Sequence, residues 1–315
     1  MYRERVNKVT KIFVAGHNGM VGSAICRKLN SLGYHNLILK SSKDLDLRNQ
    51  KQTQDFFKKE QPEFVFLAAA KVGGILANST FKADFIYDNL MIQNNVIKSA
   101  HNYGVEKLLF LGSSCIYPKD SLQPIKEKYL LSGYLEKTNE PYAIAKIAGI
   151  NLCESYNQQY KLNYKCLMPC NAYGINDNYD PIGSHFFPAL IKKIIDSIRY
   201  RKNTIEIWGN GKPLRELIFS DDIADACVFF LQKKTKETLI NIGTGKDRSI
   251  TEYAKLIMKH LGVNLKIVYK KNQPNGTMRK VLDVSIAKRY GWRSKTSLKK
   301  GLSITINDYL KRNLA

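Results

Sequence analysis

The chain has 315 residues, of which 44% are hydrophobic and 24% charged, a globular composition that excludes disordered, collagen-like and disulfide-scaffold proteins. The length predicts two domains. The net charge of +23 is uneven, because residues 1–160 carry 21 Lys/Arg against 14 Asp/Glu and residues 161–315 carry 29 against 13. This charge favours anionic partners without choosing among nucleic acid, a membrane surface and a phosphate-bearing small molecule.

The six cysteines form no CxxC pair and have no zinc-type histidine spacing, so we expect reduced thiols and no metal site. They are Cys26, Cys115, Cys153, Cys166, Cys170 and Cys227. No apolar run approaches the roughly 18 residues of a membrane helix, and residues 1–11 are not followed by the apolar region of a signal peptide. We therefore expect a cytoplasmic protein with no membrane partner.

From residue 10 onward, short β-branched runs alternate with helical stretches. The expected strands are Lys11–Ala15, Asn36–Lys40, Phe64–Ala68, Lys107–Gly112 and Tyr164–Met168. The expected helices are Met20–Leu32, Gln50–Glu60, Ala83–Tyr103 and Pro141–Tyr160. This alternation predicts parallel strands with crossover helices, and hence an α/β fold of the Rossmann type with a doubly wound parallel sheet.

After about Pro169 the rhythm changes, because Gly, Pro and Asn cluster at 169–184 and 209–213. Helices are expected at Phe187–Arg199 and Asp221–Gln232, and strands at Ile205–Trp208 and Leu239–Ile242. We infer a smaller, partly interleaved α/β domain. The expected first domain covers 1–170 plus about 215–238, and the second covers about 171–214 and 239–315.

Gly16, Gly19 and Gly22 form a GxxGxxG loop between the first expected strand and the first expected helix. In such a loop the glycines permit a tight turn, a close approach of the backbone to a pyrophosphate and close packing of the helix on the strand. The N-terminus of the helix then faces the anion. This context predicts a dinucleotide site.

The end of the second expected strand indicates which dinucleotide binds. It carries Lys40, Ser42 and Lys43, with no acid at the strand tip. A carboxylate there would bind the ribose 2′-hydroxyl of NAD, whereas cations suit the 2′-phosphate of NADP. The residues favour NADP, and ordinary solvated lysines are the alternative interpretation.

Tyr142 and Lys146 lie four residues apart at the start of a helix opened by Pro141, so both side chains share one face. An adjacent ammonium is expected to lower the tyrosine pKa from its usual value of about 10 and make the pair a usable acid/base. Ser113 or Ser114, at the end of the strand LLFLGSS, would supply a hydroxyl to bind the reacting oxygen.

This combination resembles the extended short-chain dehydrogenase/reductase superfamily. Within it, the segments GHNGMVGSAI, AAAKVGGI, LGSSCIYP, NEPYAIAKIAG and WGNGKPLRE resemble the GDP-L-fucose synthases, and the similarity runs from about Lys11 to the C-terminal end. The resemblance implies NADPH-dependent reduction at C4, with epimerisation at C3 and C5, of a GDP-4-keto-6-deoxy sugar. It also implies that Ser113, Tyr142 and Lys146 carry out the reduction.

By the same resemblance, Cys115 and His185 are the epimerisation pair, with Cys115 as base and His185 as acid. Both residue types have unperturbed pKa values within about two units of neutrality, where general acid/base catalysis is efficient. The first domain is then expected to bind NADP(H) and the second the GDP-sugar, the latter through Lys193, Trp208, Arg215 and Arg279. The expected cofactor-binding residues are Gly16, His17, Asn18, Gly19, Met20, Val21, Gly22, Lys40, Ser42, Lys43, Asp46, Leu47, Ala69, Leu111, Gly112, Ser114, Lys146, Pro169, Cys170, Asn171, Ala172 and His185.

The sequence departs from the family pattern at several positions, two of which bear on the site. Asn18 stands where the family usually has an arginine that reaches the 2′-phosphate, and Ala172 stands where it usually has a leucine. A smaller Ala172 suggests a roomier pocket, and with it the alternative of a C4 reductase for a GDP-4-keto-6-deoxyheptose with reduced or no epimerase activity. Another alternative is a nucleotide-sugar 4-epimerase or dehydratase that recycles its cofactor, although Cys115 and Ile116 do not match the acid pair of dehydratases.

An alternative from another class is a non-catalytic Rossmann protein that senses cofactor or binds nucleic acid. Its best support is the stretch from Lys259 to Lys300, with twelve basic residues and one acid, Asp283. No nucleic-acid-binding motif accompanies this stretch, so we expect a solvated surface and no nucleic-acid partner. The family resemblance further implies a homodimer whose four-helix interface is built from Ala83–Tyr103 and Pro141–Tyr160 of both copies.

Overall fold

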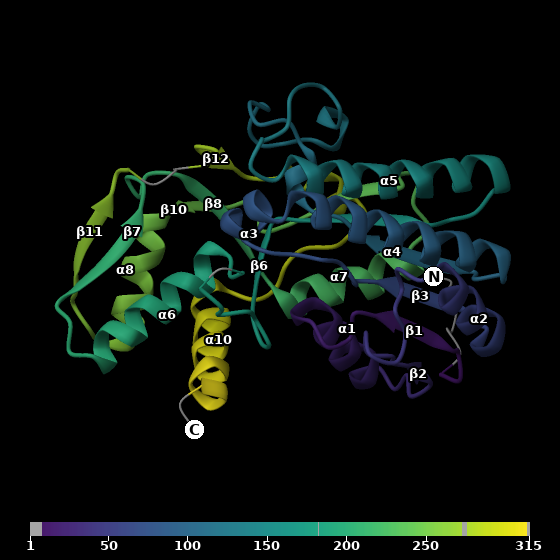
Figure 1. Ribbon diagram of the computed structural model, residues 1–315, viewed down its shortest axis with the longest axis horizontal. Coiled ribbons are helices and arrows are strands. Elements are labelled where there is room, and N and C mark those ends of the chain that lie inside the picture. The colour runs from purple at the N-terminus through teal and green to yellow at the C-terminus, as the bar shows by residue number, and fades with distance from the viewer. Residues whose placement is uncertain (1–7, 182, 273–275, 314–315) are drawn as a thin grey trace.

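The computed structural model describes residues 8–181, 183–272 and 276–313, and it contains a central parallel sheet flanked by a second group of elements (Figure 1). The sheet has the strand order β2-β1-β3-β4-β5-β9, with every pairing parallel. Its strands are β1 Ile12–Ala15, β2 Leu37–Ile38, β3 Phe64–Leu67, β4 Lys107–Leu111, β5 Lys165–Pro169 and β9 Leu239–Ile242. The expected Rossmann-type α/β fold is confirmed.

Helices cover both faces of this sheet. They are α1 Met20–Ser31, α2 Gln50–Glu60, α4 Lys82–Asn102, α5 Glu140–Tyr160 and α7 Ser220–Gln232. The helices α4 and α5 pack together on one face, and α1 and α7 pack together on the other (Figure 1). Because both faces are covered, β1 and β3 are apolar and buried along their whole length, as parallel strands in such sheets are.

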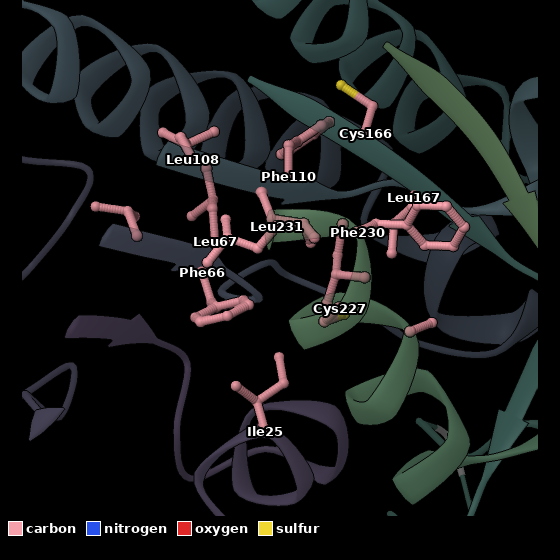
Figure 2. Packing of buried hydrophobic residues seen from close by; sticks show 14 of the residues in the cluster. Ile25, Phe66, Leu67, Leu108, Phe110, Cys166, Leu167, Cys227, Phe230 and Leu231 are labelled. Carbon is pink, nitrogen blue, oxygen red and sulfur yellow. The ribbon is translucent and has the colours of Figure 1, made fainter. Parts of the chain in front are cut away.

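The core between the sheet and α1/α7 is made of large apolar side chains. In Figure 2, Phe66 of β3, Ile25 of α1 and Cys227 of α7 lie on the same side of the sheet, and all three are fully buried. A buried phenylalanine or isoleucine side chain contributes about 1.5–3 kcal/mol by leaving water. All six cysteines are free, and Cys166 and Cys227 are core residues.

The second group of elements has its own core. Its strands are β6 Asn171–Tyr173, β7 Thr204–Trp208, β8 Leu214–Phe219, β10 Asp247–Ser249, β11 Lys266–Lys270 and β12 Arg279–Lys280, and its helices are α6 Phe186–Arg199, α8 Ile250–Leu261 and α10 Leu298–Asn313. The short helices α3 Ile75–Thr80 and α9 Ser285–Arg289 complete the fold. Phe187, Ile207, Tyr253 and Ile306 are buried together in this second core.

The two groups are interleaved along the chain, and they meet at β8. Ile218 belongs to the first core, whereas its neighbours Leu217 and Phe219 belong to the second, because successive strand residues point to opposite faces. The strand β9, which the expected boundaries assign to the second domain, instead pairs with β5 and completes the central sheet. Within the described ranges, no helix is both long and apolar enough to cross a membrane.

Candidate active site

The glycine loop between β1 and α1 is packed too closely for side chains at Gly16 and Gly22, but not at Gly19. Gly16 has φ +84°, and a Cβ on Gly22 would lie 2.0 Å from the Gly16 carbonyl oxygen. A Cβ on Gly19 would meet that oxygen at 3.4 Å and no other atom within 4 Å, so the side of the loop at Gly19 is accessible to a ligand. Gly19 is the N-cap of α1 and offers no side-chain cap, and the buried Nδ1 of His17 has no hydrogen-bond partner among the described residues. These features fit a dinucleotide pyrophosphate at the helix N-terminus.

The predicted 2′-phosphate side chains, Lys40, Ser42 and Lys43, are all exposed just beyond β2. Asp46 is different, because its carboxylate is already bound by Arg48 through two hydrogen bonds of 2.9 Å. These charged contacts lower the pKa of Asp46. A cofactor contact from Asp46 would therefore use its backbone or the acceptor sites of the carboxylate that Arg48 leaves free.

The other expected cofactor residues follow the carboxyl ends of parallel strands, where open α/β sheets bind ligands. Met20 and Val21 begin α1, and Leu47 is buried between β2 and α2. Ala69 follows β3, the group Leu111, Gly112 and Ser114 lies at the end of β4, and the group Pro169, Cys170, Asn171 and Ala172 spans the end of β5 and the start of β6.

Lys146 is buried on α5, where its Nζ donates a 2.8 Å hydrogen bond to the Leu111 carbonyl at the end of β4. The same Nζ lies 5.8 Å from the centre of the Tyr142 ring, so the two side chains share one helix face as predicted. Burial lowers the pKa of Lys146 to about 8. Burial also raises the pKa of Tyr142, which is the opposite of the direction expected from the neighbouring ammonium.

Ser113 and Ser114 are distinguished by burial. Ser114 is buried, whereas Ser113 is partly exposed and its Oγ accepts a hydrogen bond from the Cys115 N–H at 3.5 Å. Ser113 is therefore the better placed of the two serines to reach a reacting oxygen.

Cys115 is buried at this strand end, and burial raises the pKa of its thiol. The positive charge of Lys280 on β12 is the strongest effect that opposes this rise in the Cys115 pKa. Sequence reasoning missed Lys280. Burial lowers the pKa of Lys280, which also interacts with the charge of Arg215. The expected contact Arg279 is exposed and bound to Asp247 at 2.6 Å, because adjacent strand residues point to opposite faces.

His185 is at the N-cap of α6, where its side chain caps no backbone group. Part of the residue is accessible to solvent, but desolvation of the imidazole by the surrounding protein lowers its pKa. The loop before it is fixed by a 3.0 Å hydrogen bond from Gly74 N–H to the Gly183 carbonyl. Phe85 packs beneath the glycine preceding Gly74, and its ring meets the Tyr142 ring edge-on at 6.2 Å. Phe85 therefore packs against both Tyr142 and the glycine pair that contacts the loop before His185.

The expected substrate contacts form two groups. The Lys193 Nζ lies 5.6 Å from the centre of the Trp208 ring, and Trp208 is 43% exposed. In the other group, Arg215 of β8 is the register partner of Lys280 of β12. Burial lowers the pKa of Arg215 to about 10, although the negative charge of Glu136 acts to raise it. Each group presents cations that suit a diphosphate.

A glycine loop on a Rossmann-type sheet, with a serine, tyrosine and lysine around the end of β4, defines an oxidoreductase of the short-chain dehydrogenase/reductase type. Residues 12–243 match the model of the NAD dependent epimerase/dehydratase family. A putative GDP-L-fucose synthase 2 from Arabidopsis thaliana is 50% identical over 97% of this chain and 93% of its own length. The GDP-L-fucose synthase of Escherichia coli K12 is 47% identical over 96% of this chain and 97% of its own length.

The chain belongs to the NAD dependent epimerase/dehydratase family and, within it, to the GDP-L-fucose synthases. Among solved structures, a GDP-D-glycero-L-gluco-heptose synthase from Campylobacter jejuni, determined in the presence of NADPH, superposes with a TM-score of 0.88 at 38% identity. That match covers 97% of this chain and 99% of the other.

Proposed function

We propose that this protein reduces a GDP-4-keto-6-deoxy sugar at C4 with NADPH and epimerises it at C3 and C5. The observation that carries the proposal is the position of Cys115. It is a buried thiol two residues after Ser113, and the charges of Lys146 and Lys280 both act on it. A reductase alone needs the serine, tyrosine and lysine, whereas a cysteine at this place adds a group able to take a proton from carbon.

The chain's own residues would hold the cofactor at two places. The glycine loop with the α1 N-terminus would bind the pyrophosphate, and Lys40 and Lys43 would bind the 2′-phosphate. When bound, the nicotinamide supplies the hydride that C4 accepts.

In the reduction, Tyr142 donates a proton to the C4 oxygen. Its raised pKa keeps the phenol protonated at neutral pH, so the acid is in the required form before reaction. The Ser113 hydroxyl donates a hydrogen bond to the same oxygen. The Lys146 ammonium, anchored on the Leu111 carbonyl, stabilises the negative charge that develops as Tyr142 gives up its proton.

In the epimerisation, the C4 carbonyl acidifies the hydrogens on C3 and C5. Cys115 removes a proton from one face, and His185 returns a proton to the other. Burial alone disfavours the Cys115 thiolate, but the ammonium groups of Lys280 and Lys146 favour it. The same Lys280, with Arg215, is suited to the diphosphate, so substrate binding and thiol activation share a cation.

The first experiment is incubation with GDP-4-keto-6-deoxymannose and NADPH. NADPH absorbance reports reduction, and NMR of the product reports the configuration at C3, C4 and C5. Net NADPH consumption with inversion at C3 and C5 supports the proposal. Turnover without net consumption would instead identify an epimerase or dehydratase that recycles its cofactor.

A second candidate is C4 reduction of a GDP-4-keto-6-deoxyheptose with little or no epimerisation. It is favoured by the GDP-heptose synthase among the structural neighbours and by the small, partly buried Ala172. Parallel turnover of the hexose and heptose substrates decides between the two. Equal or better use of the hexose refutes the heptose assignment.

We further propose that the protein is a cytoplasmic homodimer joined through α4 and α5. These adjacent helices expose large apolar groups, namely Tyr87, Ile144 and Tyr160 at 62%, 43% and 43%. Ile144→Glu should give a monomer in sedimentation velocity, whereas Ile198→Glu on α6 should not. A wild-type monomer would refute the dimer.

A further inference from the structure

Asn176 joins the C-terminal helix to the cofactor loop. It lies in the segment that follows β6, and its contacts reach both the loop before α1 and the helix α10. Its side-chain Nδ2 donates a 2.7 Å hydrogen bond to the backbone carbonyl of Asn18 in the glycine loop. A residue 158 positions along the chain thus contacts the loop expected to hold the pyrophosphate.

The helix α10 holds Asn176 at two further atoms. Arg312 Nη1 donates to its Oδ1 at 3.0 Å, and its backbone N–H donates to Asp308 Oδ2 at 3.0 Å. Asp308 and Arg312 lie one helical turn apart and pair at 3.3 Å, and Arg312 Nη2 also binds the Asp177 carbonyl at 3.1 Å. The amide group is therefore fixed from the side of α10, which directs its remaining donor at Asn18.

The backbone of Asn176 is in the left-handed region, with φ +66°. Asparagine tolerates this conformation better than most side chains, but it still persists only where the surroundings fix it. Here the surroundings are the two side chains of α10. This conformation separates the two roles of Asn176, because glycine would keep the backbone and remove only the side chain.

The bond to Asn18 acts on the peptide that leads into Gly19, the N-cap of α1. That peptide joins Asn18 to Gly19, and its N–H donates to the Gly16 carbonyl at 3.0 Å. Its carbonyl is held by Asn176 on the opposite side. Both ends of the peptide dipole are thus fixed next to the N-cap of α1, so the amide groups that would bind a pyrophosphate are preorganised.

We propose that Asn176, held by Arg312 and Asp308, is a positioning residue for the dinucleotide. It orients the Asn18–Gly19 peptide and thereby makes cofactor affinity depend on the docking of α10. The inference rests on the proposed NADPH dependence.

The test measures the dissociation constant of NADPH by fluorescence titration, together with the KM of the GDP-sugar and thermal stability. Asn176→Gly should weaken NADPH binding about three- to tenfold, the equivalent of one lost hydrogen bond, with the melting temperature unchanged or higher. At saturating NADPH, kcat and the KM of the GDP-sugar should stay within about twofold of wild type, a split that general destabilisation would not produce.

Two matched variants on α10 supply a second test of the inference and its control. Arg312→Ala and Lys311→Ala each remove one cation from the last turn of the helix, but only Arg312 contacts Asn176. Arg312→Ala should weaken NADPH binding, and Lys311→Ala should not. The inference is overturned if Asn176→Gly binds NADPH as the wild type does, or if the two α10 variants lose equal affinity. Failure of the wild type to bind NADPH would instead overturn the proposed function.

Discussion

Glu216 of β8 is the most consequential buried acid near the proposed substrate site. It is fully buried, and its Oε1 accepts hydrogen bonds from the N–H groups of Thr244 and Gly245, both at 2.6 Å. Its Oε2 accepts from the Leu282 N–H at 2.8 Å. Glu216 directly follows Arg215, and Leu282 lies two residues after Lys280. One carboxylate therefore fixes the backbone from which both cations of the proposed substrate site project.

Glu216→Gln keeps the length of the side chain but replaces one acceptor oxygen with an NH2 group that faces N–H donors. One or two charge-assisted hydrogen bonds are lost, each worth about 1.5–3 kcal/mol, and a buried donor is left unpaired. Burying the charged carboxylate is itself unfavourable, which is why burial raises the pKa of Glu216. Removal of the charge therefore offsets part of the lost hydrogen-bond energy. We expect the free energy of unfolding to fall by about 2–4 kcal/mol.

Urea denaturation measures this change, and Glu206→Gln is the matched control because Glu206 is exposed and its carboxylate pairs with Lys270 at the surface. The control should change stability by less than about 0.5 kcal/mol. In folded Glu216→Gln, the KM of the GDP-sugar should rise several-fold, while the dissociation constant of NADPH stays constant. Stability within about 0.5 kcal/mol of wild type, or an unchanged KM, would refute the reasoning.

Cys115→Ser and His185→Gln should each abolish inversion at C3 and C5 while NADPH is still consumed; product NMR decides, and joint loss of both activities in a folded variant would contradict the assigned roles. Gly19→Ala should keep wild-type thermal stability but lose NADPH affinity, whereas Gly22→Ala should also lower the melting temperature, because its Cβ would lie 2.0 Å from backbone oxygen. Burial raises the pKa of Asp177 to about 7. Asp177 therefore loses its proton at a lower pH in the unfolded chain than in the folded protein. The free energy of unfolding should fall as pH rises from about 4 to 7, by about 4 kcal/mol at most. Urea titrations of Asp177→Asn at several pH values should lack this fall.

The central sheet could be predicted because its strands and helices carry local signals. The helix α2, for example, is an amphipathic segment preceded by Asn49, whose side chain caps it, and its bounds match the expected Gln50–Glu60. The strands β8 and β12 had no such signal. β8 contains Arg215 and Glu216, and the burial of that acid makes sense only once the N–H groups of distant segments surround it. Tertiary pairing, not the local pattern, creates these strands.

The same distinction separates the predicted and unpredicted parts of the site. The positions of Tyr142 and Lys146 follow from helical spacing, and the structure brings them together. The direction of the Tyr142 pKa shift depends on burial, which the spacing does not contain. Lys280 was missed in favour of Arg279, because the choice requires knowing that this segment pairs with β8 and which face it turns to Cys115.

The basic stretch from Lys259 to Lys300 is distributed over several structural roles. Lys280 lies beside Cys115, Arg289 binds Glu237, and Lys295 binds Asp225. A nucleic-acid surface needs its cations aligned along one face, where they can follow a phosphate backbone. Here several cations are engaged by acids of the central domain or turned toward the proposed substrate site. Arg279, Arg289, Lys295 and Lys280 are therefore not aligned as a continuous surface for a polyanion, and of these four only Lys280 lies where it could serve a small phosphorylated ligand.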